Sequence, residues 1–135
     1  MPILKITLLC VMCLAFAGCA KKSDGKVSLT GKVTLDGEPI PEGSITFMPV
    51  SAVGTTNGTE ISNGYFSVRV NPGEQAVQIY ANRPDLKHPV TKELKERGVE
   101  ENLEQYIPAK YNRQSTLRVT VDKDTKEHNF ELTSK

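Results

Sequence analysis

Apolar and polar residues alternate along seven short stretches of this chain. In the first stretch Val27, Leu29 and Val33 fall on one side, while polar residues such as Ser28 and Lys32 fall on the other. A period of two is typical of a strand that packs one face on a core and turns the other to water. The pattern therefore predicts an all-β domain. Its seven expected strands are residues 27–35, 44–48, 59–61, 65–70, 76–81, 117–121 and 128–132.

Turn-forming residues separate these stretches. Asp36-Gly37 follows the first one, and both residue types tolerate a positive φ. Residues 38–43 add two prolines and a glycine, so we expect the first two strands to pair as a β-hairpin with an extended turn. The strand count favours a seven-stranded antiparallel Greek-key sandwich over a parallel fold, because only residues 83–105 have room for a crossover helix.

Residues 83–105 interrupt the strand pattern. Two prolines give an extended entry, after which Thr91 could cap a short helix over residues 92–97. Apolar residues then recur at helical spacing at Val99, Leu103 and Tyr106. We expect a short helical insertion around residues 91–105 that lays an apolar stripe over the sandwich. Its mixed charges favour a solvated cover, and a partner surface is the alternative.

The first eighteen residues have the pattern of a secretion signal. Lys5 is the only charge before Lys21, and residues 6–17 are apolar apart from Thr7. This run of twelve matches the apolar region of a signal peptide. A bilayer-spanning helix needs about twenty such residues, so this run is too short for one. An uncleaved N-terminal anchor is the alternative. We expect residues 1–18 to be a lipoprotein signal peptide, 19–26 a lipidated cysteine with its tether, and 27–135 the β-sandwich domain.

The end of this segment, Ala17-Gly18-Cys19, resembles a bacterial lipobox, although Phe16 stands where the motif usually has Leu. The resemblance implies that Cys19 is lipidated and becomes the first residue of the mature chain. Such a chain would have one cysteine and no intramolecular disulfide, so its core alone would hold the fold. A free or intermolecularly paired Cys19 thiol is the alternative.

Charge and export together limit the partners. A chain that starts at Cys19 carries sixteen basic and sixteen acidic side chains, which gives no electrostatic case for a nucleic-acid partner. Lys21 and Lys22 would lie among lipid headgroups, where each adds about 1 kcal/mol of attraction if the leaflet is anionic. We expect a location in the cell envelope, anchored to a membrane through an N-terminal lipid. The partner would be an envelope protein or a polysaccharide.

Three pieces of the chain together resemble a known domain class. They are residues 31–40 with 43–49, Asn63-Gly64-Tyr65-Phe66 with Pro72-Gly73-Glu74, and residues 107–112 leading to 115–117. They look like the carboxypeptidase-regulatory-like, transthyretin-like β-sandwich domains of small bacterial lipoproteins. The resemblance spans most of residues 30–132, and residues 83–105 are where the chain departs from it. Domains of this class are generally non-catalytic, so the resemblance implies a binding or structural module.

The candidate catalytic residues are few. His128 alternates with Phe130 and Leu132, which is typical of a packed histidine, and His88 lies in the insertion beside Pro89. The transthyretin-like hydrolases close on a Tyr-Arg-Gly-Ser signature that has no counterpart in residues 130–135. We expect no catalytic residue and no cofactor. A small hydrolase that depends on His128 remains a less favoured alternative.

Two places in the sequence have residues that could bind a ligand. Asp122, Asp124 and Thr125 make an oxygen-rich turn without the spacing of an EF-hand, and no His/Cys cluster is present for zinc, so we expect no metal site. Tyr106 and Tyr111 flank Pro108 and could form a platform for a sugar or a peptide. A carbohydrate- or peptidoglycan-binding module is therefore the alternative function. Simple packing of these rings is the other interpretation.

Overall fold

A computed structural model describes residues 23–135 of the chain. The expected signal peptide, Cys19 and most of the tether lie outside the described residues. The domain that follows is all-β, as the alternation predicted. Its main strands are β1 (Val27–Leu35), β3 (Glu42–Pro49), β4 (Asn57–Ser62), β5 (Tyr65–Val70), β6 (Gly73–Tyr80), β9 (Arg118–Val121) and β10 (Phe130–Leu132). They correspond to the seven predicted stretches.

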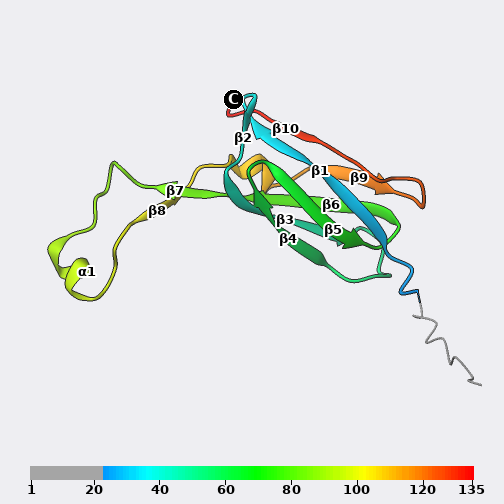
Figure 1. The fold of residues 1–135 in the computed structure, drawn as a ribbon, viewed down its shortest axis with the longest axis horizontal. Coiled ribbons are helices and arrows are strands. Elements are labelled where there is room, and N and C mark those ends of the chain that lie inside the picture. The colour runs from blue at the N-terminus through cyan, green and yellow to red at the C-terminus, as the bar shows by residue number, and fades with distance from the viewer. Residues whose placement is uncertain (1–22) are drawn as a thin grey trace, which may run out of the picture.

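These strands form one curled sheet in the order β10-β1-β5-β4-β3-β6-β9, with the two-residue strand β2 (Glu38–Pro39) paired to β1 (Figure 1). Neighbours along this path pair antiparallel except β1 and β10, which are parallel. The sequence predicted only antiparallel pairs. A last strand that runs beside the first, in the same direction, leaves no local signal, because the two segments lie about a hundred residues apart.

The predicted hairpin between the first two strands is wrong. Asp36 and Gly37 do make a tight turn, with φ of 51° and 85°, but it joins β1 to β2. β1 then pairs with β5, and β3 pairs with β4 and β6. The turn after β4 explains the difference. The Ile40 N–H still donates to the Val33 carbonyl at 3.1 Å, but the Val33 N–H donates to the Gly64 carbonyl and the Gly64 N–H donates to the Ile40 carbonyl, so Gly64 takes the bonds that would continue the ladder.

The core lies inside the curl of the sheet and is built from the alternating apolar positions. Leu29, Ile45 and Val77 are fully buried, and each comes from a different strand. Three phenylalanines meet at its centre: Phe47 lies 5.8 Å from Phe66 and 6.3 Å from Phe130 between ring centroids. The rings are tilted against one another by 41° to 57°. Because aromatic rings bury large areas, this trio joins β3, β5 and β10 into one body.

Residues 82–105 project from this body as an arm (Figure 1). Strands β7 (Asn82–Pro84) and β8 (Leu103–Gln105) pair antiparallel at its base, and helix α1 (Lys92–Glu96) lies towards its tip. The Thr91 hydroxyl accepts a hydrogen bond from the Leu94 N–H, which confirms the predicted cap, and Gly98 leaves the helix with φ of 85°.

The expected apolar stripe over the sandwich is wrong. Leu103 lies in a strand rather than a helix, its side chain is 58% exposed, and Leu86 on the same arm is 89% exposed. Leu86 and Leu103 therefore cover none of the core, and of the three residues of the expected stripe only Tyr106 packs against it. Residues 103–105 form a strand because they pair with residues 82–84. Helical spacing of three apolar residues is too short a pattern to exclude that outcome.

Candidate binding surface at the base of the arm

The base of the arm is fixed to the end of β6 by backbone and side-chain hydrogen bonds. The Tyr106 N–H donates to the Ala81 carbonyl at 3.1 Å. The Gln105 side-chain oxygen accepts from the Ala81 N–H at 3.2 Å and from the Ile107 N–H at 2.9 Å. Ile107 is buried in the core. The residues on both sides of Tyr106 are thus held in place, which positions its ring at the junction of arm and body.

Tyr106 is half-buried, and one face of its ring meets a cation. The guanidinium of Arg83 lies 5.1 Å from the ring centroid, and Glu104 holds that guanidinium through an ion pair of 2.6 Å. Burial raises the pKa of the Tyr106 hydroxyl. The arrangement offers a stacked aromatic and cation pair with a neutral hydroxyl, and an orienting carboxylate behind it.

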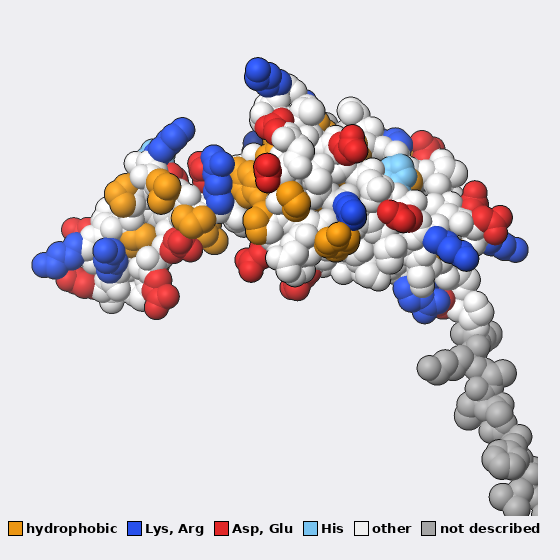
Figure 2. Space-filling model, turned by 45° about the horizontal axis from the view of Figure 1, so that its top comes forward, with side chains coloured by type: hydrophobic (Ala, Val, Ile, Leu, Met, Phe, Trp, Pro, Cys, Tyr) orange, Lys and Arg blue, Asp and Glu red, His pale blue; other side chains and the backbone are white. Residues whose placement is uncertain are grey.

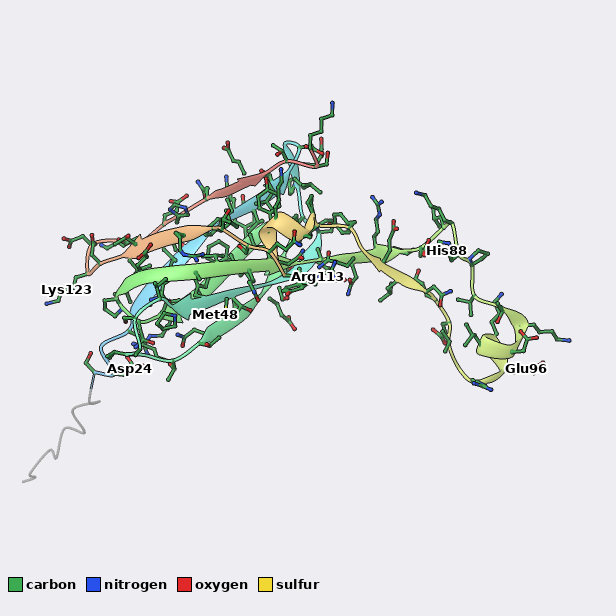
Figure 3. All side chains as sticks on the ribbon, turned by 180° about the vertical axis from the view of Figure 1, so that it is seen from behind. Asp24, Met48, His88, Glu96, Arg113 and Lys123 are labelled. Atoms are coloured by element: carbon green, nitrogen blue, oxygen red, sulfur yellow. The ribbon has the colours of Figure 1, made fainter. Side chains whose placement is uncertain are left out.

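Two open hollows lie around this ring, and both are lined by Asn82 and Tyr106. One has a volume of about 520 Å³ and is bordered by Glu42 and Asn63 of the body. The other, of about 600 Å³, is bordered by Tyr80 and by residues of the segment after β8. Figure 2 shows apolar side chains gathered where the arm meets the body, and Figure 3 places Arg113 at the same junction. We call these two hollows the junction groove.

Tyr111 has a different setting. It ends the short 3-10 helix η1 (Ala109–Tyr111), and its hydroxyl accepts a hydrogen bond from the Thr133 N–H at 3.0 Å. The Lys110 ammonium lies 5.0 Å from the centre of its ring. Tyr111 lines neither hollow of the junction groove. Both predicted platform residues pack in part against the core, as the packing interpretation expects. They differ in that Tyr111 ties the C-terminal segment to η1, whereas Tyr106 also lines both hollows.

Sequence reasoning missed several residues of the groove. Asn112 is buried, and its side-chain N–H donates to the carbonyls of Ile107 and Pro108, so it fixes the turn that follows Tyr106. Asn82 and Arg83 reach the groove through the pairing of β7 with β8. In the sequence, these three residues are distinguished only as polar residues near the end of a predicted strand. Many other residues of the chain fit that description.

The two histidines lie in separate parts of the molecule. His88 belongs to the arm (Figure 3), where its Nδ1 lies 2.7 Å from a carboxylate oxygen of Asp85, and that hydrogen bond holds the pKa of Asp85 below its usual value. The His128 ring packs on Phe130 at 4.7 Å between centroids, and its backbone N–H donates to the Thr30 carbonyl. His128 precedes β10 and is half-buried, as expected for a packed histidine.

In the oxygen-rich turn of Asp122, Asp124 and Thr125, the Asp122 carboxylate is hydrogen-bonded within the turn. One oxygen of Asp122 accepts hydrogen bonds from the Asp124 N–H and from both the N–H and the hydroxyl of Thr125, which lowers the pKa of Asp122. Within residues 23–135, no three His, Cys, Asp or Glu side chains gather as a metal site would require. In the same residues, no helix has the length and apolar character needed to cross a bilayer.

Comparison with known proteins gives little. No protein-family model matches the chain, and no curated protein matches it. A solved structure of a 9R-lipoxygenase from Cyanothece PCC8801 superposes with a TM-score of 0.40 and 13% sequence identity. The match covers 81% of this chain and 16% of that chain, so this chain spans about a sixth of the lipoxygenase. A likeness of this size supports no inference about activity.

Proposed function

We propose that this protein is a non-catalytic, lipid-anchored lipoprotein of the cell envelope whose arm and junction groove form a binding or structural module. The proposed anchor is Cys19, modified after export across the inner membrane and removal of residues 1–18. The proposed finer fold is a transthyretin-like Greek-key sandwich of the carboxypeptidase-regulatory-like class. Support for that fold comes from the seven main strands and from the turns at Asp36-Gly37 and Asn63-Gly64, where all four residues have positive φ.

The observation that carries the proposal is the placement of the two ends of the domain. β1 starts at the end opposite the arm, as Figures 1 and 3 show. A lipid at Cys19 would lie four residues before Ser23, the first described residue. A chain tied to a bilayer there would hold the arm and the junction groove on the side away from the lipid. Such an arrangement suits a module that meets a partner in the envelope space.

The anchor is tested by Cys19→Ser. We expect the wild-type chain to incorporate a fatty-acid label and to stay with membranes after a carbonate wash, since acyl chains add about 0.8 kcal/mol of binding per buried methylene. Cys19→Ser should lose the label entirely. Cys13→Ser is the matched control, because it removes a thiol from the expected signal peptide and should leave labelling unchanged. A wild-type chain without label, or an undiminished label in Cys19→Ser, would contradict the anchor.

Carbohydrate is the second candidate ligand, and the junction groove favours it. Sugar rings stack on aromatic faces and take hydrogen bonds from neighbouring polar groups, and small-molecule sites are concave with a few convergent polar residues. Tyr106 supplies the ring, and Asn82 and Arg83 supply amide and guanidinium donors around it. The proposed ligand on this view is a polysaccharide such as a peptidoglycan strand.

Tyr106→Ala tests this second candidate. We expect it to weaken retention on isolated cell-wall material by roughly tenfold, because truncating a central aromatic of a binding site commonly costs 1 to 2 kcal/mol. Tyr106→Phe should retain most of the binding, since it keeps the ring. Tyr65→Ala is the control: Tyr65 is exposed, pairs with the ammonium of Lys32, and lies outside the groove. Equal retention of all three variants would exclude a sugar site at Tyr106.

A further inference from the structure

The end of the domain opposite the arm carries a hollow with a volume of about 610 Å³. Its charged lining residues are Lys26, Lys123 and Lys126, and no acidic residue lines it. The remaining lining residues are Ser23, Gly25, Val27, Ser28 and Thr30. We call it the lysine hollow. Figure 3 places Lys123 at the same end of the domain as Asp24, and far from Glu96 on the arm.

The fold builds the lysine hollow from two segments that are distant in sequence. The turn after β9 returns along the start of β1, where the Thr30 N–H and hydroxyl both donate to the Lys126 carbonyl, at 3.0 and 3.2 Å. Asp122 closes the same turn through its internal hydrogen bonds and so fixes the backbone that carries Lys123. The lysines thus come together through backbone contacts and stay together without a ligand.

Two acidic groups at this end have partners of their own, Asp24 and, within its turn, Asp122. Asp124 and Glu127 of the same turn are exposed and do not line the hollow. Asp24 forms an ion pair of 2.6 Å with Arg69, and its carboxylate also accepts the Lys26 N–H, which lowers the pKa of Asp24. Lys26 donates from its ammonium to the Asn57 side chain at 2.7 Å. In the described part of the chain, the ion pairs are those of Arg69, Arg83 and His88, and none includes a lysine of the hollow. The lining of the hollow is therefore positive, and the turn that carries Lys123 and Lys126 also has the exposed carboxylates of Asp124 and Glu127 outside it.

We propose that the lysine hollow binds the phosphate headgroups of anionic lipid in the membrane that holds the anchor. This inference rests on the proposed lipid at Cys19. The four residues from Cys19 to Ser23 reach at most about 14 Å, so a lipidated chain keeps the hollow close to the headgroups. The Debye length at physiological salt is about 8 Å, so the lysines act on the headgroups when the tether is bent rather than fully extended. The lysines then act at short range on a charge of opposite sign.

The consequence for function is orientation. A lipid anchor alone leaves the domain free to tilt about its tether. Three lysines at one pole, together with Lys21 and Lys22 in the tether sequence, would turn that pole towards an anionic leaflet. The arm and the junction groove would then point away from the bilayer. The lysine hollow thereby fixes the direction in which the proposed binding module faces.

The first experiment maps lysine reactivity on the lipidated protein. The chain is purified from membranes, placed in vesicles of phosphatidylcholine alone or with phosphatidylglycerol, and acetylated with a water-soluble amine reagent. We expect anionic vesicles to slow the acetylation of Lys26, Lys123 and Lys126 several-fold. Lys92 and Lys95 of α1 are controls in the same molecule and should react equally on both vesicles. Equal reactivity of all five lysines on both vesicles would overturn the proposal.

A second experiment measures binding with charge-removing variants. Lys123→Gln with Lys126→Gln should reduce the affinity for anionic vesicles by about fivefold per lysine, and added salt should erase the difference. Lys92→Gln with Lys95→Gln removes the same charge from the arm and should change nothing. An equal loss in the two double variants would show a net-charge effect and refute a site in the hollow.

The two proposals fail in different ways. Failure of the anchor shows as a chain that does not sediment with neutral vesicles. In that case binding to anionic vesicles still decides the lysine hollow, because it must depend on Lys123 and Lys126 and not on Lys92 and Lys95. An anchored chain whose lysines are indifferent to lipid charge would leave the proposed function standing and would exclude the headgroup site.

Discussion

Phe47→Ala should lower the free energy of unfolding by about 3 to 5 kcal/mol, as expected for removing a fully buried aromatic ring from a core. Phe47 has no exposed surface, and its ring meets Phe66 and Phe130, which come from β5 and β10. Deleting it leaves a void at the centre of the single core cluster, beside Phe66 and Phe130. Since domains of this size are commonly stable by only 5 to 15 kcal/mol, the variant should be close to unfolding.

Urea denaturation followed by far-ultraviolet circular dichroism measures this effect. Tyr65→Ala is the control, because it also removes an aromatic ring from β-structure but from a side chain that is 57% exposed, and its cost should stay below about 0.5 kcal/mol. Phe47→Leu should fall between the two, since it refills part of the void. If Phe47→Ala and Tyr65→Ala were equally stable, the three rings would not be the centre of the core.

The strands were predictable because a half-buried sheet imposes its own period on the sequence. β5 shows this most simply: Phe66, Val68 and Val70 are buried, and the residues between them are exposed. Burial of one face is a local property, so each stretch reveals itself without knowledge of its neighbours. The same reasoning gives the tight turns, because Asp36 and Asn63 precede glycines and need positive φ.

Strand partners were not predictable in the same way. The order of the sheet depends on which ladder each strand joins, and that choice is made by contacts between segments distant in sequence. Asn63-Gly64 is recognisable as a turn in the sequence, yet nothing local shows that Gly64 bonds to Val33 and Ile40 and so ends the pairing of β2 with β1. The arm shows a similar limit, since Leu103 suits a helix by spacing and becomes a strand by pairing with Pro84.

The candidate site was predictable in part. Tyr106 stood out as an aromatic in a polar segment, and the structure gives it an open groove. Its neighbours Asn82 and Arg83 lie more than twenty residues earlier, and only the pairing of β7 with β8 brings them to it. The lysine hollow could not be predicted from the sequence, because Lys26 and Lys123 are separated by nearly the whole domain and only the fold brings them together. Charge in the sequence predicts attraction to anions, but the fold decides where that charge collects.

Gly31→Ala should destabilise the domain by about 3 to 5 kcal/mol, although it adds a single methyl group. A Cβ on Gly31 would lie 1.8 Å from the backbone carbonyl oxygen of His128 and 2.8 Å from a ring carbon of Phe66. No side-chain rotamer relieves a clash with backbone. The segment before β10 would have to move off β1 and lose the hydrogen bond from the His128 N–H to Thr30 and that from the Lys32 N–H to Asn129.

Gly58→Ala is the matched control for this prediction. Gly58 also lies in a strand, but an added Cβ there would meet nothing closer than the Thr46 hydroxyl at 3.4 Å. Because alanine restricts the unfolded chain more than glycine does, Gly58→Ala should be neutral or slightly stabilising. Hydrogen exchange adds a local measurement, since in Gly31→Ala the amides of residues 128–132 should lose protection before those of β3 and β6. Equal unfolding midpoints for the two variants would contradict the close parallel approach of the last strand to the first, on which both the core and the lysine hollow depend.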